Sequence, residues 1–218
     1  MSNLVLAKND TSLLKNLCII LYNNNKFIPQ LFEGLISMNP TVNNQGNILS
    51  VGCGSRQSES GVIRLDISPE VNPDVVWNLN SFPYPFDESS FSIIECFDVI
   101  EHLNNIPKVL EYFHKILHPD GVLKITTPHF SCANSYIDPT HKWHLSYFSF
   151  DYFSNSHNLS YYSKARYRIR YRHLQFQGGR FNRSILSRLA NKFPKIYEQR
   201  WAWMFPAWYV YFELEAIK

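Results

Sequence analysis

The chain has few cysteines and no closely spaced pair of them. The four that it has are Cys18, Cys53, Cys96 and Cys132. Disulfide-stabilised domains and thiolate metal sites need cysteines in denser patterns, such as CxxC pairs. The sequence therefore predicts neither a disulfide framework nor a cysteine metal site, and it favours a reducing, cytoplasmic environment.

Long hydrophobic runs are also absent. No apolar stretch reaches the roughly 20 residues that span a bilayer, and the apolar run at residues 17–22 is followed directly by asparagines. The N-terminus lacks the basic start and the small-residue cleavage site of a signal peptide. We therefore expect a soluble protein with at most peripheral membrane contact.

Acidic residues are missing from residues 152–197, where ten Lys or Arg residues occur. Four of these alternate with other residues and would share one face of a strand: Arg166, Arg168, Arg170 and Arg172. Such a stripe either binds an anion, such as a phosphate group of a substrate, or protects an exposed sheet edge. For the aromatic residues between positions 201 and 211, we expect core packing rather than membrane contact.

The length and composition favour one domain. With 218 residues, of which 45% are hydrophobic, the chain can bury a sizeable core, and we expect a single domain over residues 1–218. We expect N-terminal helices in residues 1–46, a cofactor-binding half in residues 47–128, and an acceptor-side insertion with the C-terminal strands in residues 129–218.

Short apolar strands and helices alternate in the predicted order of elements. Strands are expected at residues 48–51, 62–66, 74–77, 91–97, 122–126, 165–176 and 208–217, and helices at 12–22, 29–38, 103–117 and 182–195. This order predicts an α/β fold with a Rossmann-like doubly wound sheet, mostly parallel with an antiparallel last strand, and helices on both faces. Ligands of such a sheet bind at the carboxyl ends of the strands.

The first expected strand ends in a Gly-Cys-Gly loop, and the second ends in an aspartate. Gly52 and Gly54 let the backbone approach a ligand closely, and Asp66 can accept hydrogen bonds from both hydroxyls of a ribose. Each feature alone is also compatible with an ordinary turn or cap, but together they predict a nucleotide-like cofactor. A third glycine of the dinucleotide pattern would fall at Gln57, which argues against a nicotinamide dehydrogenase.

Five segments in order resemble motifs of the class I S-adenosylmethionine-dependent methyltransferases. They are the glycine loop at 48–54, the ribose-binding strand at 62–66, a "PFPDNSFD"-like stretch at 83–91, an "hVLEHL"-like DVIEHL at 98–103, and an "LKPGG"-like turn at 117–121. The chain is similar to type 11-like members, including those of bacterial surface-glycan gene clusters. The resemblance implies an enzyme that uses S-adenosylmethionine.

The resemblance also implies a set of cofactor-binding residues. The glycines would bracket the methionine end, the aspartate would hold the ribose, and Asn78 with the backbone of Leu79 would border the adenine. The chain departs from the family pattern at Asn78, where an acid is common, and at Ser92, where an aspartate is usual. The implied set is Gly52, Cys53, Gly54, Asp66, Asn78, Leu79 and Asp98.

Candidate catalytic residues follow the fifth strand. Residues 128–144 resemble a "PH…DPTH" insertion of methyltransferases from surface-glycan gene clusters. A histidine of ordinary pKa can accept the proton of a hydroxyl, so we take His129 and His141, with Asp138, as the candidates and slightly prefer His129. The alternative is that Asp138 and His141 only fix the loop.

We expect no metal site in this region. Imidazole and carboxylate groups suit several divalent ions, but the spacing of His129, Asp138, His141 and His144 matches no metal-binding signature. For His102 and Glu101, which precede the helix after the fourth strand, we expect packing or capping roles.

The leading functional prediction is O-methylation of a sugar or another surface-glycan precursor, with or without a phosphate group. An RNA or other nucleic-acid methyltransferase is the first alternative. The basic stripe favours it, but no (D/N)PP(Y/F) tetrapeptide follows the fourth strand. A non-catalytic, cofactor-binding partner of another enzyme is the third reading. The acceptor atom and the oligomeric state do not follow from the sequence.

Overall fold

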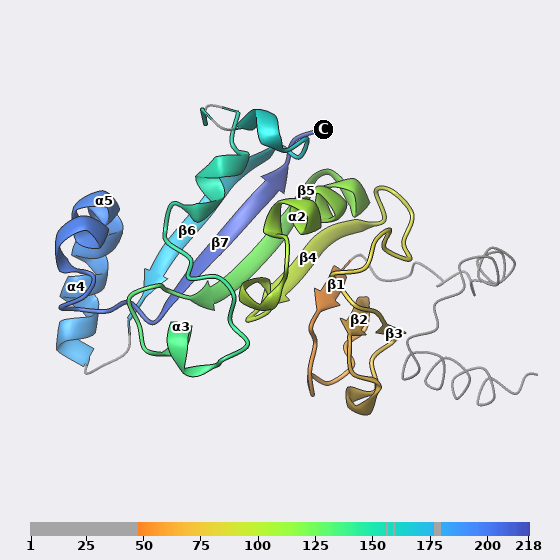
Figure 1. The fold of residues 1–218 in the computed structure, drawn as a ribbon, viewed down its shortest axis with the longest axis horizontal. Helices are drawn as coiled ribbons and strands as arrows, with labels where there is room; N and C mark the ends of the chain where they lie inside the picture. Colours follow the sequence, from red (N-terminus) through yellow and green to blue (C-terminus); the bar gives the residue numbers. More distant parts are fainter. Residues whose placement is uncertain (1–47, 156, 159, 177–179) are drawn as a thin grey trace, which may run out of the picture. The chain divides into compact units, whose positions relative to one another are not determined.

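The computed structural model describes residues 48–155, 157–158, 160–176 and 180–218 (Figure 1). The helices expected at residues 12–22 and 29–38 lie outside these residues, as does Cys18. Among the described residues, no helix is both long and apolar enough to cross a bilayer.

The strands form one seven-stranded sheet. Their bounds are β1 Ile48–Val51, β2 Val62–Asp66, β3 Val75–Val76, β4 Phe91–Phe97, β5 Leu117–Pro128, β6 Tyr167–Gln175 and β7 Tyr209–Ala216. The order across the sheet is β3-β2-β1-β4-β5-β7-β6. β7 runs antiparallel to both of its neighbours, whereas the other pairings are parallel. The predicted mixed sheet with an antiparallel last strand is confirmed.

The strand order reverses between β1 and β4, which lie side by side in the middle of the sheet. The chain leaves β1 toward β2 and β3 on one side, and it returns through β4 toward β5 on the other side. In open α/β sheets, ligands bind in the crevice outside the carboxyl ends of the strands at such a switch point. We therefore expect the ligand site at the segments that follow β1 and β4.

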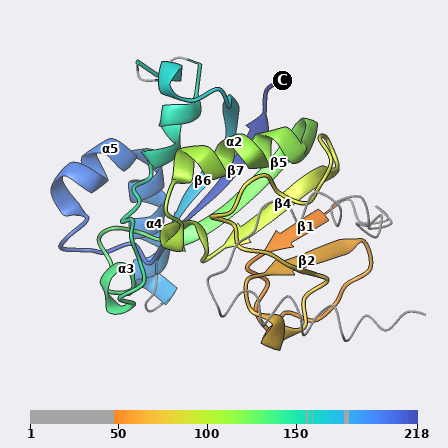
Figure 2. The same cartoon turned by 45° about the vertical axis from the view of Figure 1, so that its right-hand side comes forward.

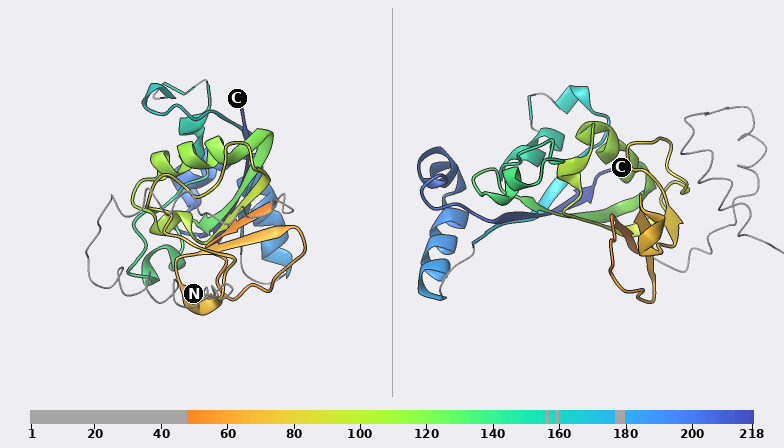
Figure 3. Two further views of the ribbon diagram at one scale, coloured as in Figure 1. Left: turned by 90° about the vertical axis from the view of Figure 1, so that its right-hand side faces the viewer. Right: turned by 60° about the horizontal axis from the view of Figure 1, so that its bottom comes forward.

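The hydrophobic core lies on one face of the sheet. The register aligns the buried side chains of this face, which are Leu49 and Val51 of β1, Ile94 and Cys96 of β4, Leu123 and Ile125 of β5, and Phe212 and Leu214 of β7. The α2 helix, Ile106–Ile116, lies over this face (Figure 2). The 3-10 helix η5, Ser149–Phe153, lies on the same side (Figure 3), where Phe150 contacts Phe212 edge to face.

The α2 helix forms because its sequence carries both a cap and an apolar stripe. The side chain of Asn105 accepts a hydrogen bond from the backbone N–H of Lys108, and Pro107 lies in the first turn, where a missing N–H has no cost. The residues that face the core recur at helical spacing and are all buried. They are Ile106, Val109, Leu110, Phe113 and Ile116.

The opposite face of the sheet carries polar side chains. Glu95 of β4, Lys124 of β5 and Glu213 of β7 are aligned in one row by the strand register. Arg56, from the loop after β1, reaches this row and donates to Glu95 Oε2 at 2.5 Å. Because these groups are only partly buried, they need no apolar cover.

The connections between β1 and β4 contain no α-helix, and the expected order of elements also places none there. Residues 52–61 contain turns and no helix, and the link from β2 to β3 contains only the 3-10 helix η3, Pro69–Val71. The helix predicted at 103–117 begins at Ile106, because the 3-10 helix η4, Ile100–His102, precedes it. Short links leave no room for full crossover helices.

The remaining elements lie toward the C-terminal side of the sheet. They are α3 Asn134–Ile137, the 3-10 helix η6 Ser160–Tyr162, α4 Arg180–Lys192, α5 Pro194–Ile196 and the π-helix η7 Tyr197–Trp201. The α4 and α5 helices lie beyond the ends of β6 and β7 (Figure 1).

The expectation of core packing is wrong for part of the C-terminal aromatic run. The exposed fractions are 48% for Trp201, 69% for Trp203 and 45% for Phe205. These residues precede β7, which begins at Tyr209, so they lie in η7 and the turn after it and not in the sheet.

The four arginines at positions 166–172 do not form one stripe, and Arg166 lies before the start of β6. A bulge between Ile169 and Tyr171 shifts the register, so that Arg168 lies opposite Glu215 and Arg172 lies opposite Phe212. Because Glu215 and Phe212 are three residues apart on β7, they point to opposite faces of the sheet. The prediction of one shared face is therefore wrong.

These arginines also have carboxylate partners from other segments. Arg168 donates to Glu215, and Arg170 Nε lies 3.4 Å from the same carboxylate. Arg172 donates to Asp151 Oδ1 at 2.6 Å. Acidic residues outside 152–197 thus neutralise much of the positive charge of these arginines. The sequence alone suggested that this charge could bind an anion.

We predict that Gly52→Ala destabilises the protein more than Gly54→Ala. Both glycines have positive φ, at 58° and 51°, so a side chain costs about 1–2 kcal/mol at either position. At Gly52, a Cβ would also stand 2.3 Å from Val99 Cγ2, whereas at Gly54 no atom lies within 4 Å. Overpacking adds about 1–3 kcal/mol, which urea unfolding would measure. Equal losses at the two sites would contradict the steric role of Val99.

Candidate functional site

The glycine loop and Asp66 are brought together, as their pairing in the sequence predicted. Asp66 accepts hydrogen bonds from the backbone N–H of Gly54, at Oδ2, and of Ser68, at Oδ1, each at 2.9 Å. The backbone N–H of Cys53 donates to the carbonyl of Leu65 at 3.1 Å. The loop after β1 is therefore tied to the end of β2. Each carboxylate oxygen of Asp66 retains a further lone pair.

The same loop also touches the segment that follows β4. The side chain of Val99 occupies the space where a Cβ of Gly52 would stand, so this segment lies directly beside the glycine loop. Asp98 has a positive φ of 56°, and its backbone N–H donates to the carbonyl of Thr126 on β5 at 3.0 Å. Burial raises the pKa of the Asp98 carboxyl, against the opposing effect of nearby histidines. The carboxyl ends of β1, β4 and β5 thus meet here.

Asn78 and Leu79 lie in the turn that follows β3. Asn78 Oδ1 accepts a hydrogen bond from the backbone N–H of Asn80 at 2.9 Å. Leu79 is buried, and its carbonyl accepts a hydrogen bond from the hydroxyl of Tyr84 at 2.9 Å. The side-chain oxygen of Asn78 therefore fixes its own turn.

Glu101, His102 and His141 converge beside Asp98. One potential metal-ligand atom from each of the three residues lies within 4.8 Å of the others. The rings of His102 and His141 meet edge to face, with centroids 4.6 Å apart. His141 Nε2 lies 4.0 Å from Glu101 Oε1 and 4.0 Å from Asp138 Oδ2. This group of Glu101, His102 and His141 is called the EHH cluster below.

The carboxyl group of Glu101 is buried without a hydrogen bond. The residue is 1% exposed, and within the described part of the chain neither side-chain oxygen has a hydrogen-bond partner, although the Thr127 hydroxyl faces it. Burial raises the pKa of Glu101 to about 7, and the negative charge of Asp98 adds to this effect. The group can therefore hold or release a proton near neutral pH.

Asp138 acts on the EHH cluster through Thr140. Asp138 Oδ1 accepts hydrogen bonds from the backbone N–H of Thr140 at 2.8 Å and from its hydroxyl at 2.7 Å. These bonds hold the pKa of Asp138 below its usual range. The Thr140 oxygen lies 2.9 Å from His102 Nδ1. Since the hydroxyl proton goes to Asp138, the imidazole N–H donates to Thr140.

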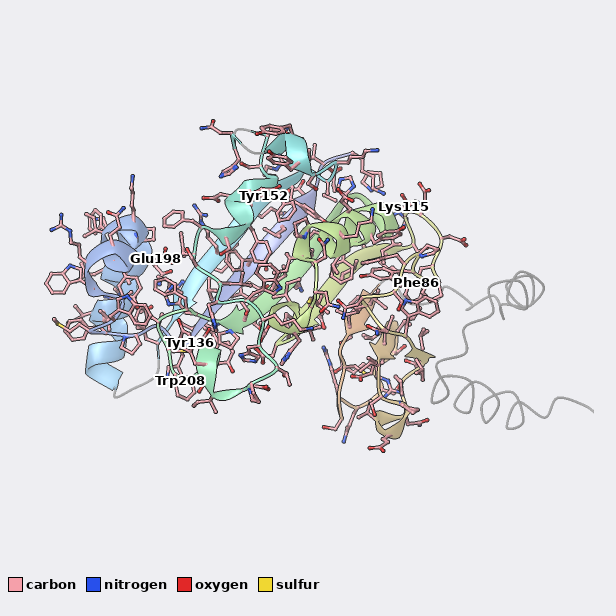
Figure 4. The ribbon with its side chains drawn as sticks, viewed as in Figure 1. Phe86, Lys115, Tyr136, Tyr152, Glu198 and Trp208 are labelled. Atoms are coloured by element: carbon pink, nitrogen blue, oxygen red, sulfur yellow. The ribbon has the colours of Figure 1, made fainter. Side chains whose placement is uncertain are left out.

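His129 lies apart from the EHH cluster and is fully buried. Its Nε2 donates to Glu198 Oε1 at 3.0 Å, and its Nδ1 pairs with the Ser131 hydroxyl at 2.8 Å. Glu198, which Figure 4 labels, also accepts from the Ser146 hydroxyl at 2.8 Å and from the backbone N–H of Tyr147 at 2.6 Å. Both ring nitrogens of His129 are engaged, which favours a structural role over the role of base that the sequence suggested.

The structure gives two further residues a different place from the one that the sequence predicted. Glu101 and His102, expected to pack or cap, are members of the EHH cluster. Their place in the DVIEHL segment, three and four residues after the aspartate that follows β4, was the available signal. His144 instead stacks on Tyr136, which Figure 4 labels, with ring centroids 4.1 Å apart.

A protein family described as "Methyltransferase domain" matches residues 24–188. The chain belongs to this methyltransferase family. An S-adenosylmethionine-dependent methyltransferase from Archaeoglobus fulgidus shares the fold, with a TM-score of 0.52, 14% identity, and coverage of 91% of this chain and 99% of that chain. One from Mesorhizobium loti has a TM-score of 0.48, 14% identity, and coverage of 84% and 96%. No curated protein matches the sequence.

The methyltransferase uses S-adenosylmethionine as its cofactor, and its acceptor is a small molecule or a macromolecule. The residues at the strand ends fit this cofactor. The position of a Cβ at Gly54 is open space, so a ligand can approach the backbone there. The free lone pairs of Asp66 suit ribose hydroxyls, and Asn78 with the Leu79 backbone would border the adenine. Cys53 is buried, and burial raises the pKa of its thiol.

We predict that Asp66→Ala lowers the affinity for S-adenosylmethionine at least tenfold, because it removes the ribose acceptor and the anchor of the glycine loop. Isothermal titration calorimetry would measure the change. Asp87→Ala is the control, because Asp87 is exposed in the segment that precedes β4, at the opposite end of this strand from the glycine loop. An unchanged affinity for Asp66→Ala would exclude the assigned role.

We predict that Glu198→Gln lowers the free energy of unfolding in a pH-dependent way. Burial alone would raise the pKa of Glu198, but hydrogen bonds from His129, Tyr147 and Ser146 lower it below the ordinary 4.5. The charged form therefore stabilises the native state by about 1–3 kcal/mol above pH 4.5, and this contribution is lost as the pH falls through the lowered native pKa.

Urea unfolding at a series of pH values would test this expectation. The difference between wild type and Glu198→Gln should be constant at neutral pH and should shrink in acid. Glu70→Gln, at an exposed position in η3, is the control and should show no such difference. A difference that does not change with pH would contradict the assigned charge state.

Proposed function

We propose that this methyltransferase transfers a methyl group to a hydroxyl of a sugar or another surface-glycan precursor, with or without a phosphate group. The observation that supports this proposal is the convergence of the EHH cluster with Asp98, next to the glycine loop. Imidazole and carboxylate groups at this position suit an acceptor whose proton must leave when the methyl group arrives.

The bound cofactor supplies a methyl group on a positively charged sulfur. The protein contributes position: the acceptor oxygen has to lie in line with the carbon–sulfur bond at near-attack distance. When bound, the cofactor would supply the methyl carbon and would be left as a neutral thioether, while the acceptor hydroxyl would give its proton to a group of the protein. No oxidant or reductant takes part.

His141 is the proposed acceptor of the hydroxyl proton. Its Nδ1 lies 3.3 Å from the carbonyl oxygen of Ser135, which can only accept, so Nδ1 carries the hydrogen and Nε2 has a free lone pair. Nε2 faces the carboxyl groups of Glu101 and Asp138. Their charges would stabilise the imidazolium that forms. Asp138 is thus a positioning residue, through Thr140 and by its charge.

The arginines of β6 give little support to the nucleic-acid alternative. Arg168 and Arg170 are paired with Glu215, and Arg172 with Asp151. A surface that neutralises RNA phosphates needs cations without such partners. The resemblance of residues 128–144 to the "PH…DPTH" insertion favours glycan precursors over RNA.

We predict that His141→Ala lowers kcat about 10²- to 10⁴-fold, the usual contribution of a general base, while the affinity for S-adenosylmethionine changes less than twofold. Methyl transfer from labelled cofactor to a panel of nucleotide sugars, lipid-linked sugars and RNA would be measured. His144→Ala is the matched control in the same insertion. Full turnover by His141→Ala would exclude this residue as the proton acceptor, and methylation of RNA alone would exclude the glycan proposal.

A further inference from the structure

We infer that the EHH cluster binds one divalent transition-metal ion, with Zn²⁺ as the ion that its ligands suit best. The ligands would be the carboxylate of Glu101 and the Nε2 atoms of His102 and His141. The binding of the ion rests on the geometry of these side chains. Only its part in the reaction rests on the proposed function.

Both histidines present a free lone pair because their other nitrogen carries the hydrogen. His102 Nδ1 donates to Thr140, whose own hydroxyl proton goes to Asp138. His141 Nδ1 donates to the carbonyl of Ser135. Metal-ligating histidines are held in this way, with the second ring N–H donated to a carbonyl or to a group bound to a carboxylate. Each neutral imidazole can therefore ligate through Nε2.

The carboxyl group of Glu101 is the independent observation that indicates a ligand. A buried carboxylate without a hydrogen bond is costly, and native proteins pair such groups or coordinate them to metals. Glu101 is 1% exposed, and its oxygens lack a hydrogen bond within the described residues, yet Oε1 faces His141 Nε2 at 4.0 Å. A cation between them would satisfy this group.

The distances leave room for an ion at the centre. Zinc lies about 2.0–2.2 Å from imidazole nitrogen and carboxylate oxygen, so two of its ligand atoms at the tetrahedral angle lie about 3.3–3.6 Å apart. The 4.0 Å separation between Glu101 and His141, and the mutual limit of 4.8 Å in the cluster, exceed this spacing, so the side chains would close in around the ion by about 0.4–1.5 Å.

The ligand types select the ion. Two imidazoles and one carboxylate suit Zn²⁺ and related transition metals, whereas Mg²⁺ prefers an all-oxygen shell. Three protein ligands leave one position open, which is typical of catalytic and not of structural zinc. The second carboxylate oxygen of Asp138, 4.0 Å from His141 Nε2, adds negative charge at the rim of the site.

An ion in this place would change the role of His141. A hydroxyl bound at the open position would lose its proton to solvent, because the charge of the ion stabilises the alkoxide. The alkoxide oxygen would then form the bond to the methyl carbon, and no base would be needed. Under this inference His141 is a ligand, whereas without the ion it is the proton acceptor.

Metal binding can be measured without an activity assay. The full-length protein, stripped with a chelator, would be titrated with ZnCl₂ and with MgCl₂ in a calorimeter, and with CoCl₂ in a spectrophotometer. We expect one Zn²⁺ per chain, no saturable Mg²⁺ binding, and visible Co²⁺ bands typical of mixed nitrogen and oxygen coordination. Glu101→Gln and His141→Ala should each weaken Zn²⁺ binding at least 100-fold.

Two control variants separate this site from adventitious binding. His118→Ala removes an exposed histidine at the other end of β5, and His144→Ala removes a histidine of the same insertion outside the cluster. Both should bind Zn²⁺ like the wild type. Circular dichroism would verify that Glu101→Gln, which keeps the size of the side chain, remains folded. Absent Zn²⁺ binding, or binding that Glu101→Gln and His141→Ala leave unchanged, would overturn the inference.

The role in catalysis is tested separately from the proposed function. If the stripped enzyme is inactive and Zn²⁺ restores turnover, the ion takes part in the reaction. If the stripped enzyme keeps full turnover while His141→Ala abolishes it, the catalytic part of the inference is overturned and the proposed function stands. If the protein binds Zn²⁺ at the cluster but methylates no hydroxyl acceptor, the proposed function fails and the metal site stands.

Discussion

The backbone carbonyl of Glu101 holds the candidate site together. It accepts hydrogen bonds from the backbone N–H groups of Lys142, at 2.8 Å, and of Trp143, at 3.3 Å. The indole N–H of Trp143 also donates to the carbonyl of Leu103 at 2.7 Å, and the ammonium of Lys142 reaches Asn104 Oδ1 at 2.5 Å. The segment after β5 is thereby fastened to the turn after β4, and this contact holds His141 beside Glu101 and His102.

The parts of the fold that rest on local sequence signals could be predicted. The short apolar strands and the apolar stripe of α2 follow from the periodicity of the sequence. The pairing of the glycine loop with Asp66 belongs to the same class, because adjacent parallel strands bring their carboxyl ends together. No helix was predicted in the links between β1 and β3, and these links consist of turns and the 3-10 helix η3.

The contacts that decide the acceptor side join residues far apart in the sequence. His129 was a reasonable base by residue type, but Glu198, 69 positions later, occupies its Nε2. Nothing in the local sequence indicated that Glu101 would be buried without a hydrogen bond, or that His141 would face it. The charge of the β6 arginines was likewise overestimated, because Glu215 and Asp151 lie outside the segment without acids. Composition within one segment does not reveal partners from another.

At the β6 edge of the sheet, the side chain of Asn191 makes the two backbone hydrogen bonds that a neighbouring strand would otherwise make with Leu174. Asn191 of α4 accepts a hydrogen bond from the backbone N–H of Leu174 through Oδ1, at 2.7 Å, and donates to the carbonyl of Leu174 through Nδ2, at 3.0 Å. Exposed strand edges recruit further chains through such unpaired groups. Because one amide uses both groups of Leu174, a second molecule would have to displace α4 before it could extend the sheet there, and edge-to-edge aggregation is blocked at this point.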